Sequence, residues 1–327
     1  MAHPIEPYAR QAFAAGWAAS QGPMTERVKA ASIAAVQVAV EHADDPHILE
    51  VTLHLGKLEG MWAMLFSRRE KLIRQYTADV TTAWRKLIRP RLFRDGLHHL
   101  RQELGLTEAS PDQKRINDAC TAAATAILAG LPLTPGWAAL REALRNALAA
   151  GQAEGMVGAV AVAAERAGQS GLDWDKGFAG AYQQLQRLDT LWSQAETWLA
   201  RLVQRAVADL ARVLATSAAV GASYQEMLDA ASQELDGDDV EAVDFTTDWA
   251  MTTAMGAGAL GLYGLYQALA ITWTTAGDGR VCATCDENEA NSPYSVGDVP
   301  AYPAHPRCRC QLEADFDLSR FADWFTT

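Results

Sequence analysis

Cysteine is scarce in this sequence and unevenly placed. The chain of 327 residues has five cysteines, and four of them lie between positions 282 and 310. The first residues, MAHPIEPYAR, lack the basic start and apolar run of a secretory signal, so we expect a cytosolic chain whose thiols stay reduced. In that setting a tight cysteine group predicts a metal site rather than a disulfide framework. The fifth cysteine, Cys120, has apolar helical neighbours and is interpreted as a core residue.

Motifs of several enzyme classes are also missing. There is no phosphate-binding P-loop and no H-E-x-x-H zinc protease motif. The run GAGALG at 256–261 has the spelling of a dinucleotide-binding turn, but the residues before it have a helical pattern where that turn requires a strand. We interpret its small residues as a surface for close helix packing. Cys282-x-x-Cys285 lacks the H-x-E partner of the zinc deaminases, which argues against deaminase chemistry.

Basic residues are in the minority, since 28 Lys and Arg stand against 40 Asp and Glu. The resulting net charge of -12 excludes a protein that coats nucleic acid with its whole surface. Residues 68–101 differ, because ten basic residues against three acidic ones give a local charge of +7. Such a segment forms either a solvated helix face or a contact surface for phosphates or an acidic partner. The candidate contact residues are Arg68, Arg69, Lys71, Arg74, Arg85, Lys86, Arg89, Arg91 and Arg94.

Strand patterns are nearly absent, whereas helical patterns run from about residue 5 to residue 268. Apolar residues at spacings of three and four over 48–87 predict one long helix or two collinear ones, and the stripe from Leu185 through Leu188 to Ala206 predicts the core seam of a bundle. Pro135 predicts a helix start. We therefore predict a mainly α fold, with an elongated multi-helix bundle over residues 1–240 and a small β-containing module over residues 241–327.

No charged residue interrupts the segment from Trp249 to Gly277, which is long enough to span a membrane. Its threonines and five glycines make it less apolar than a lipid-facing helix should be. We therefore expect a buried helix that leads into a buried strand, and no membrane span.

The C-terminal cysteines have the spacing of a metal site. Cys282-x-x-Cys285 offers two thiolates from one tight turn, and His305-x-x-Cys308-x-Cys310 offers three further ligands. If residues 308–312 form a strand, Cys308 and Cys310 point to the same face. Thiolates with one imidazole are typical of tetrahedral zinc. We predict zinc held by four of the five, with Cys282, Cys285, Cys308 and Cys310 preferred and His305 replacing one thiolate or contacting a metal-bound sulfur.

The predicted zinc is structural rather than catalytic, because a fully occupied tetrahedron has no open position for a substrate. The module is rich in proline and poor in apolar residues, and the metal would hold it closed. Two alternatives stay open from the sequence. The thiols are unligated, or they form two disulfides in a protein that works outside a cell.

The same residues carry a resemblance to a known family. The runs ITWTTAGDGRVCATC and PAYPAHPRCRCQL resemble the C-terminal module of phage head morphogenesis proteins of the Mu F-like or SPP1 minor head protein type. In that family a helix rich in small residues leads into a strand with a tryptophan, then an Asp-x-Arg-Val-Cys-x-x-Cys turn and a His-Pro-x-Cys-Arg-Cys run. The matching positions are Trp273, Asp278, Arg280, Val281, Cys282, Cys285, His305, Pro306, Cys308, Arg309 and Cys310.

This resemblance implies a minor structural protein of a tailed-phage or prophage particle, and not an enzyme. It implies several copies per particle, located in the virion inside the capsid near the portal, after assembly in the host cytoplasm. The implied partners are the portal protein, with major capsid or scaffold proteins as further candidates, and DNA contacted nonspecifically during packaging or ejection. The basic residues of 68–101 would make the portal or DNA contact.

Two other classes of function compete with this one. A thiol-dependent enzyme would use one cysteine as nucleophile with His305 as base, and it requires an accessible, metal-free thiol with a lowered pKa. A zinc-module DNA-binding regulator would rely on Arg280, Arg307 and Arg309, which is little basic charge for a reader of the major groove.

Overall fold

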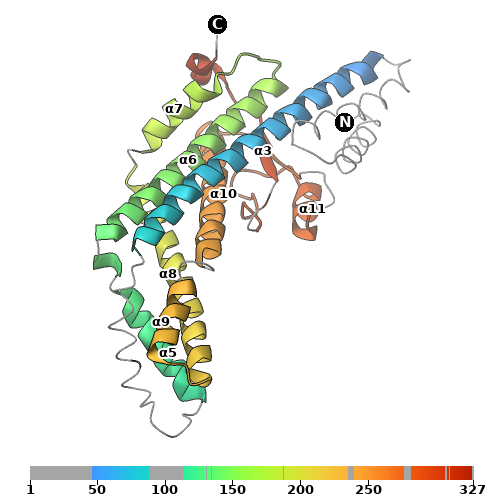
Figure 1. The fold of residues 1–327 in the computed structure, drawn as a ribbon. Coiled ribbons are helices and arrows are strands. Elements are labelled where there is room, and N and C mark those ends of the chain that lie inside the picture. Colours follow the sequence, from blue (N-terminus) through green and yellow to red (C-terminus); the bar gives the residue numbers. More distant parts are fainter. Residues whose placement is uncertain are drawn as a thin grey trace. The chain divides into compact units, whose positions relative to one another are not determined.

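The computed structural model describes residues 46–87, 100, 113–129, 131–133, 135–186, 188–234, 239–275, 281–305, 308 and 310–325. Over these residues the chain is mainly helical, with a small two-stranded sheet and a Cys/His cluster near its C-terminus, which confirms the predicted fold class (Figure 1). In chain order the elements are α3 (Pro46–Leu87), α5 (Gln113–Ala129), η1 (Leu131–Leu133), α6 (Pro135–Arg166), α7 (Trp174–Leu185), α8 (Thr190–Ala219), α9 (Tyr224–Gln233), α10 (Asp239–Leu265), β1 (Ile271–Thr274), α11 (Ala283–Ala290), β2 (Gln311–Ala314) and η3 (Ser319–Trp324).

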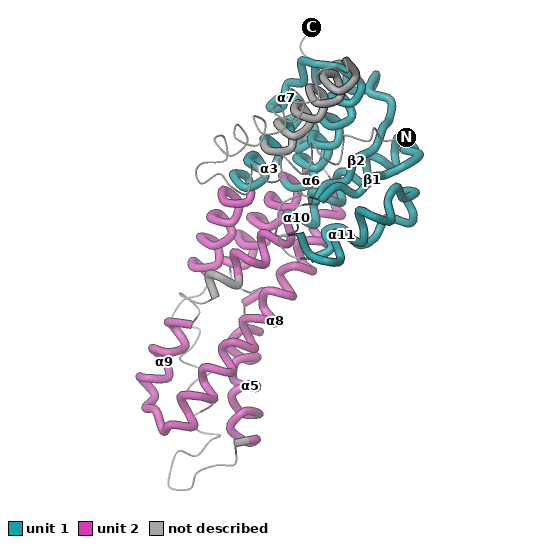
Figure 2. Tube along the Cα trace, turned by 90° about the vertical axis from the view of Figure 1, so that its right-hand side faces the viewer, with its two compact units in different colours: residues 1–72, 151–185, 252–327 teal, residues 73–150, 186–251 magenta. Residues whose placement is uncertain are grey.

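The chain folds into two compact units, each built from separate segments (Figure 2). Unit 1 comprises the described residues of 1–72, 151–185 and 252–327, and unit 2 those of 73–150 and 186–251. Helices α3, α6 and α10 therefore contribute residues to both units. The division of the chain at residue 240 stays a prediction.

Unit 2 is a bundle in which α8 packs against α5 and α9. The stripe predicted along α8 is buried at Ala195, Leu199 and Ala206, as expected for an intramolecular core. The prediction was wrong for Leu188, which is 46% exposed, because the chain leaves the helix between the end of α7 and the start of α8. Cys120 in α5 is fully buried, and burial raises the pKa of its thiol to about 11, as in an inert core cysteine.

In unit 1 the second half of α6 packs closely against the second half of α10. A side chain at Gly155 would overlap the backbone of Met255, and one at Gly258 would overlap the backbone of Gln152. The helices therefore approach at backbone distance, which only glycine permits at these points. The GAGALG run lies inside α10, and Gly256 and Gly258 lie against Tyr302 and the backbone of Gln152, which confirms close packing at these two positions. Gly261 faces open space.

The sheet of unit 1 consists of β1 and β2 in antiparallel pairing, with Trp273 opposite Leu312 and Ile271 opposite Ala314. Trp273 is fully buried, and the hydroxyl of Tyr263 in α10 donates a 2.7 Å hydrogen bond to the carbonyl of Leu312. The uncharged segment from Trp249 thus forms a helix that ends at Leu265 and leads into a buried strand, as predicted.

Helix α6 contains the candidate membrane span found among the described residues. Residues Gly136–Arg166 are long and apolar enough to cross a membrane, but 89% of the most apolar 18-residue window is buried inside the protein. A core helix of a globular fold satisfies the same criterion, so this helix is weak support for a membrane span.

Candidate metal centre

The start of α11 positions the first two cysteines. Cys282 is the residue before the helix, in an extended conformation, and its carbonyl accepts hydrogen bonds from the N–H groups of Cys285 and Asp286 at 2.9 and 3.0 Å. This turn brings the two thiols to the same side of the helix start, as the C-x-x-C spacing predicts. Cys285 is 1% exposed, whereas Cys282 is half-buried.

The remaining candidate ligands lie in the segment before β2. The N–H of Cys308 donates a 3.2 Å hydrogen bond to the carbonyl of His305, which closes a turn. The expected strand over 308–312 was wrong at its start, because β2 begins at Gln311. The carbonyls of Cys308 and Cys310 are instead bound by side chains from elsewhere in unit 1. Both cysteines are nevertheless buried.

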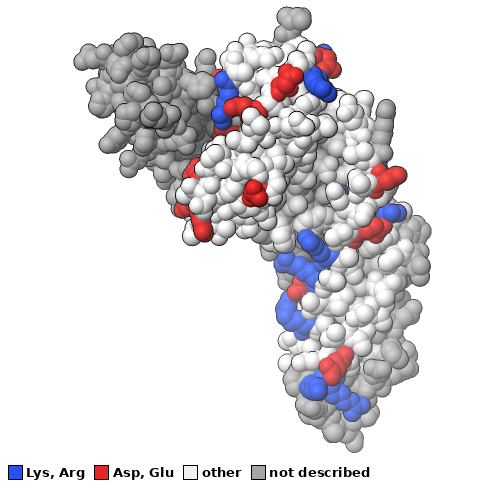
Figure 3. Space-filling view, turned by 180° about the vertical axis from the view of Figure 1, so that it is seen from behind, with Lys and Arg blue, Asp and Glu red and all other residues white. Residues whose placement is uncertain are grey.

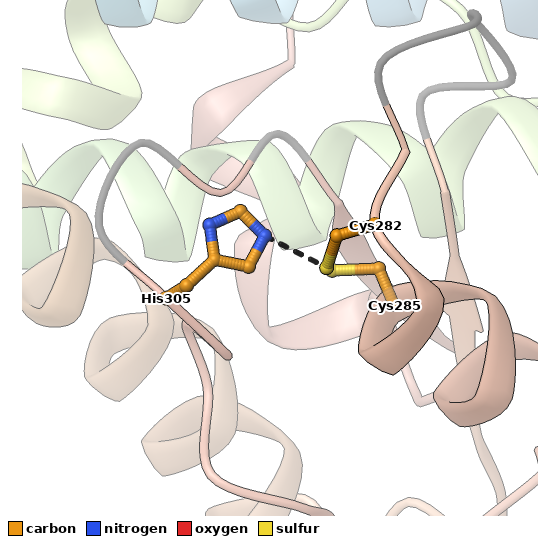
Figure 4. A group of neighbouring side chains, drawn as sticks. All are labelled: Cys282, Cys285 and His305. Carbon is orange, nitrogen blue, oxygen red and sulfur yellow. Dashed lines mark hydrogen bonds between the residues drawn. The ribbon is translucent and has the colours of Figure 1, made fainter.

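The structure brings all five predicted ligands together around Cys285. The ligand atoms of Cys282, Cys285 and His305 lie within 4.8 Å of one another, and so do those of Cys285, Cys308 and Cys310. The sulfur of Cys285 is 3.3 Å from Nε2 of His305 and 3.8 Å from the sulfur of Cys308. Figure 4 shows the imidazole of His305 facing the two cysteines at the start of α11.

These separations fit the ligand set of a tetrahedral metal ion. With metal–sulfur distances of about 2.3 Å, two thiolates on one tetrahedron lie about 3.8 Å apart. The distance from Cys285 to Cys308 has that value. Cys285 is the only member that the two groups of three ligands share. A single four-coordinate ion bound by Cys285, Cys308 and Cys310 would therefore need Cys282 or His305 to move closer as its fourth ligand. The cluster can therefore hold a metal ion, and the choice among the five ligands stays a prediction.

The thiols differ in how readily each one ionises. A hydrogen bond from the N–H of Cys285 lowers the pKa of Cys282, and burial raises the pKa of Cys285. A hydrogen bond from the Cys310 thiol lowers the pKa of Cys308, and the same bond raises the pKa of Cys310. Cys308 and Cys282 are therefore the thiols of the cluster that ionise most readily, and a bound cation would favour the thiolate form of its other ligands as well.

The arrangement is better suited to holding a cation than to attacking a substrate. The thiol that lies 3.3 Å from His305 is that of Cys285, which is buried and has a raised pKa. Cys308 has a lowered pKa but is fully buried. Cys282 combines a lowered pKa with partial exposure and is the thiol to test for reactivity.

Two of the predicted contact residues are engaged inside unit 1. Arg69 is 8% exposed, and its guanidinium binds Thr252 and the carbonyl of Cys308, so it does not present its charge at the surface. Arg68 pairs with Glu154 through a 3.1 Å contact, and its guanidinium lies over a tryptophan ring. Sequence reasoning missed these roles because both partners lie far away in the chain.

Of the other residues predicted to contact DNA or the portal, four are exposed and three lie outside the described residues. Figure 3 shows Lys and Arg side chains interspersed with acidic ones on the face in view, rather than one continuous basic field over the described residues. The exposed members are Lys71, Arg74, Arg85 and Lys86. Those outside the described residues are Arg89, Arg91 and Arg94, and also Arg280, Arg307 and Arg309 of the regulator hypothesis.

Comparison with known proteins found no relative. No family model matches the chain, and no curated protein and no solved structure matches it.

Proposed function

We propose that this chain is a minor structural protein of a tailed-phage or prophage particle, with a C-terminal module held closed by zinc. The observation that carries the proposal is the gathering of Cys282, Cys285, His305, Cys308 and Cys310 into one cluster. These are the Cys/His positions on which the resemblance to phage head morphogenesis proteins rests. Their convergence supports a shared design in the module.

Zinc is the proposed ion because thiolates with an imidazole are the donor set that it prefers at tetrahedral sites. Cys282, Cys285, Cys308 and Cys310 would hold it, and the 3.3 Å separation lets His305 donate to the sulfur of Cys285 or replace one thiolate. When bound, zinc supplies a fixed link between the start of α11 and the segment before β2. The role is structural, because four protein ligands leave no position for a substrate.

The proposed partners are the portal protein, with major capsid or scaffold proteins as further candidates, and DNA. The protein would lie inside the capsid near the portal, in several copies. The exposed basic residues Lys71, Arg74, Arg85 and Lys86 support a contact with phosphates or an acidic protein surface.

The test is quantitative mass spectrometry of purified DNA-filled particles and of portal-containing complexes from the source strain. We expect the chain in both, at a few to about a dozen copies per particle by analogy with symmetric assemblies. Absence from particles and from portal complexes would refute the structural assignment, whatever the metal content of the isolated protein.

A thiol-dependent enzyme is the second candidate, favoured by the 3.3 Å separation between Cys285 and His305. It predicts that one cysteine of the native protein reacts selectively with an alkylating reagent at neutral pH. Protection of all four clustered cysteines until a chelator is added would exclude it, because metal-bound thiolates are shielded.

A further inference from the structure

Arg69 is a buried cation beside the candidate metal centre. Its Nη2 atom donates hydrogen bonds of 2.8 Å to the hydroxyl of Thr252 and 2.7 Å to the carbonyl of Cys308. Both partners are fully buried. One guanidinium therefore joins α3 to α10 and to the cysteine segment, which lie 183 and 239 residues further along the chain.

Tyr302 makes a matching contact with the second cysteine of the pair. Its hydroxyl donates a 2.6 Å hydrogen bond to the carbonyl of Cys310. Its ring packs edge-on against Trp273, with 5.3 Å between ring centroids, in space that a side chain at Gly256 would occupy. Tyr302 and Arg69 also border the same cavity of about 40 Å³. The carbonyls of both C-x-C cysteines are thus held by side chains from outside the Cys/His cluster.

The buried carboxylate of Glu154 borders the same cavity but pairs with Arg68, so compensation of the charge of Arg69 calls for a further anion nearby. The two acceptors of its hydrogen bonds, a hydroxyl and a carbonyl, are neutral. A buried cation is costly unless opposite charge compensates it. A divalent ion held by three or four thiolates carries a net negative charge. A metal centre rich in thiolates at Cys308, whose carbonyl Arg69 binds, would supply that negative charge. The positive charge of Arg69 would in turn stabilise the negatively charged centre.

Resting on the proposed metal centre, we propose that Arg69 is a positioning residue for the metal. It fixes the backbone of Cys308 and offsets the negative charge of the cluster, while Tyr302 fixes the backbone of Cys310. Metal binding thereby locks α3 and α10 of unit 1 to the C-terminal cysteine segment. The sequence predicted that Arg69 contacts DNA or the portal at the surface. Its burial and its contacts favour a supporting role beside the metal instead.

The experiment titrates the full-length protein with Co²⁺, whose absorption reports the ligand set, in competition with a chelator. We expect Arg69→Met to weaken Co²⁺ binding about 10- to 100-fold, the range found for residues that support metal ligands. Arg69→Lys keeps the charge and should recover most of the affinity. Tyr302→Phe removes one hydroxyl and should weaken binding less than Arg69→Met. The control, Arg74→Met, changes an exposed residue of the same helix and should bind Co²⁺ like the wild type.

The spectrum separates positioning from ligation. The absorption bands of the saturated variants should keep the shape of a four-coordinate thiolate site, because no ligand is changed. Wild-type affinity in both Arg69→Met and Tyr302→Phe would overturn the inference. The inference would also be overturned if Arg69→Met lowered the free energy of unfolding equally in the metal-free and the metal-bound protein. Such a result would mean that Arg69 contributes to packing and not to metal binding. If Arg69→Met does not fold, Tyr302→Phe carries the test, because it removes the hydroxyl that binds the carbonyl of Cys310. A wild type that binds neither Co²⁺ nor Zn²⁺ would instead refute the metal centre itself.

Discussion

The Cα of Gly258 in α10 lies so close to the carbonyl oxygen of Gln152 in α6 that an added Cβ would overlap it. Gln152 is 8% exposed, so the carbonyl cannot simply turn into solvent with its helix intact. The same helix offers a contrast at Gly261, where an added Cβ would meet nothing within 4 Å. A side chain is therefore excluded by packing at Gly258 and is sterically permitted at Gly261, three residues further along the same helix.

We expect Gly258→Ala to destabilise the protein by about 1 to 3 kcal/mol, the usual cost of forcing extra volume into a packed interior. Gly261→Ala should instead stabilise it by about 0.5 to 1 kcal/mol, because alanine is the better helix former at an exposed position. Chemical denaturation followed by circular dichroism measures both. Equal effects of the two substitutions would show that α6 and α10 do not approach at backbone distance.

The helical pattern was readable from the sequence because it is local. The spacing of apolar residues over 48–87 predicted α3, and the uncharged segment from Trp249 predicted a helix followed by a strand. The break before α8 was not predicted, because the guanidinium of Arg145, 41 residues earlier in the chain, donates to the carbonyl of Gln186 at this break. A contact of that kind has no local pattern.

The candidate site was readable for a different reason. Five ligand-type residues in one short segment are rare enough to indicate a metal site, and the fold gathers them. The supporting residues were not readable. Arg69 stands within a run of surface charges, and nothing in that run distinguishes the one guanidinium that reaches a carbonyl 239 residues away. The start of β2 was misplaced because the carbonyls of Cys308 and Cys310 bind side chains.

Metal content should depend on the clustered cysteines and not on Cys120. We expect about one zinc per chain in protein purified without chelator, and loss of most of it in Cys308→Ser, because one thiolate of the set is gone. Elemental analysis of the purified protein measures this. Cys120→Ala is the control, since Cys120 is a buried thiol in α5 of unit 2. Equal zinc in Cys308→Ser and Cys120→Ala would exclude Cys308 as a ligand.

The start of α9 should make a pH-dependent contribution to stability. Ser223 and Glu226 form a reciprocal capping box, in which the N–H of Ser223 donates a 2.6 Å hydrogen bond to the Glu226 carboxylate. Hydrogen bonds from the side chain and backbone of Ser223 lower the pKa of Glu226. Folding therefore favours the ionised form. Its contribution is complete above the ordinary pKa of about 4.3 and is lost as the pH falls through the lower folded value.

Comparison of the wild type with Glu226→Gln isolates this effect. We expect the wild type to be the more stable protein at pH 6 and the difference to shrink as the pH falls below about 4. Denaturation midpoints of both proteins across this range measure it, and the acid response of the cysteine cluster cancels in the comparison. A difference that grows on acidification would contradict the lowered pKa.

The basic residues from Arg85, in the last turn of α3, to Arg91 provide a test of whether DNA binding is electrostatic and local. Neutralising Arg85, Lys86, Arg89 and Arg91 to glutamine removes four positive charges from a segment whose local charge is +7. If these residues contact phosphates, the slope of log affinity against log salt should fall by about 0.9 for each lost contact with duplex DNA. Affinity for an unrelated DNA sequence should fall by the same factor, because phosphate contacts carry no sequence information. Fluorescence anisotropy at several salt concentrations measures both quantities.

The matched control removes the same amount of charge from exposed positions on α5 and α8, namely Lys114, Arg115, Arg201 and Arg205. A general effect of net charge on DNA attraction would weaken both variants equally, since long-range attraction depends on the summed field. A local contact surface would weaken only the variant in the segment from Arg85. Unchanged DNA binding at low salt in the variant of Arg85, Lys86, Arg89 and Arg91 would show that these residues are solvated and do not contact DNA. Any contact with DNA would then come from another surface of the protein.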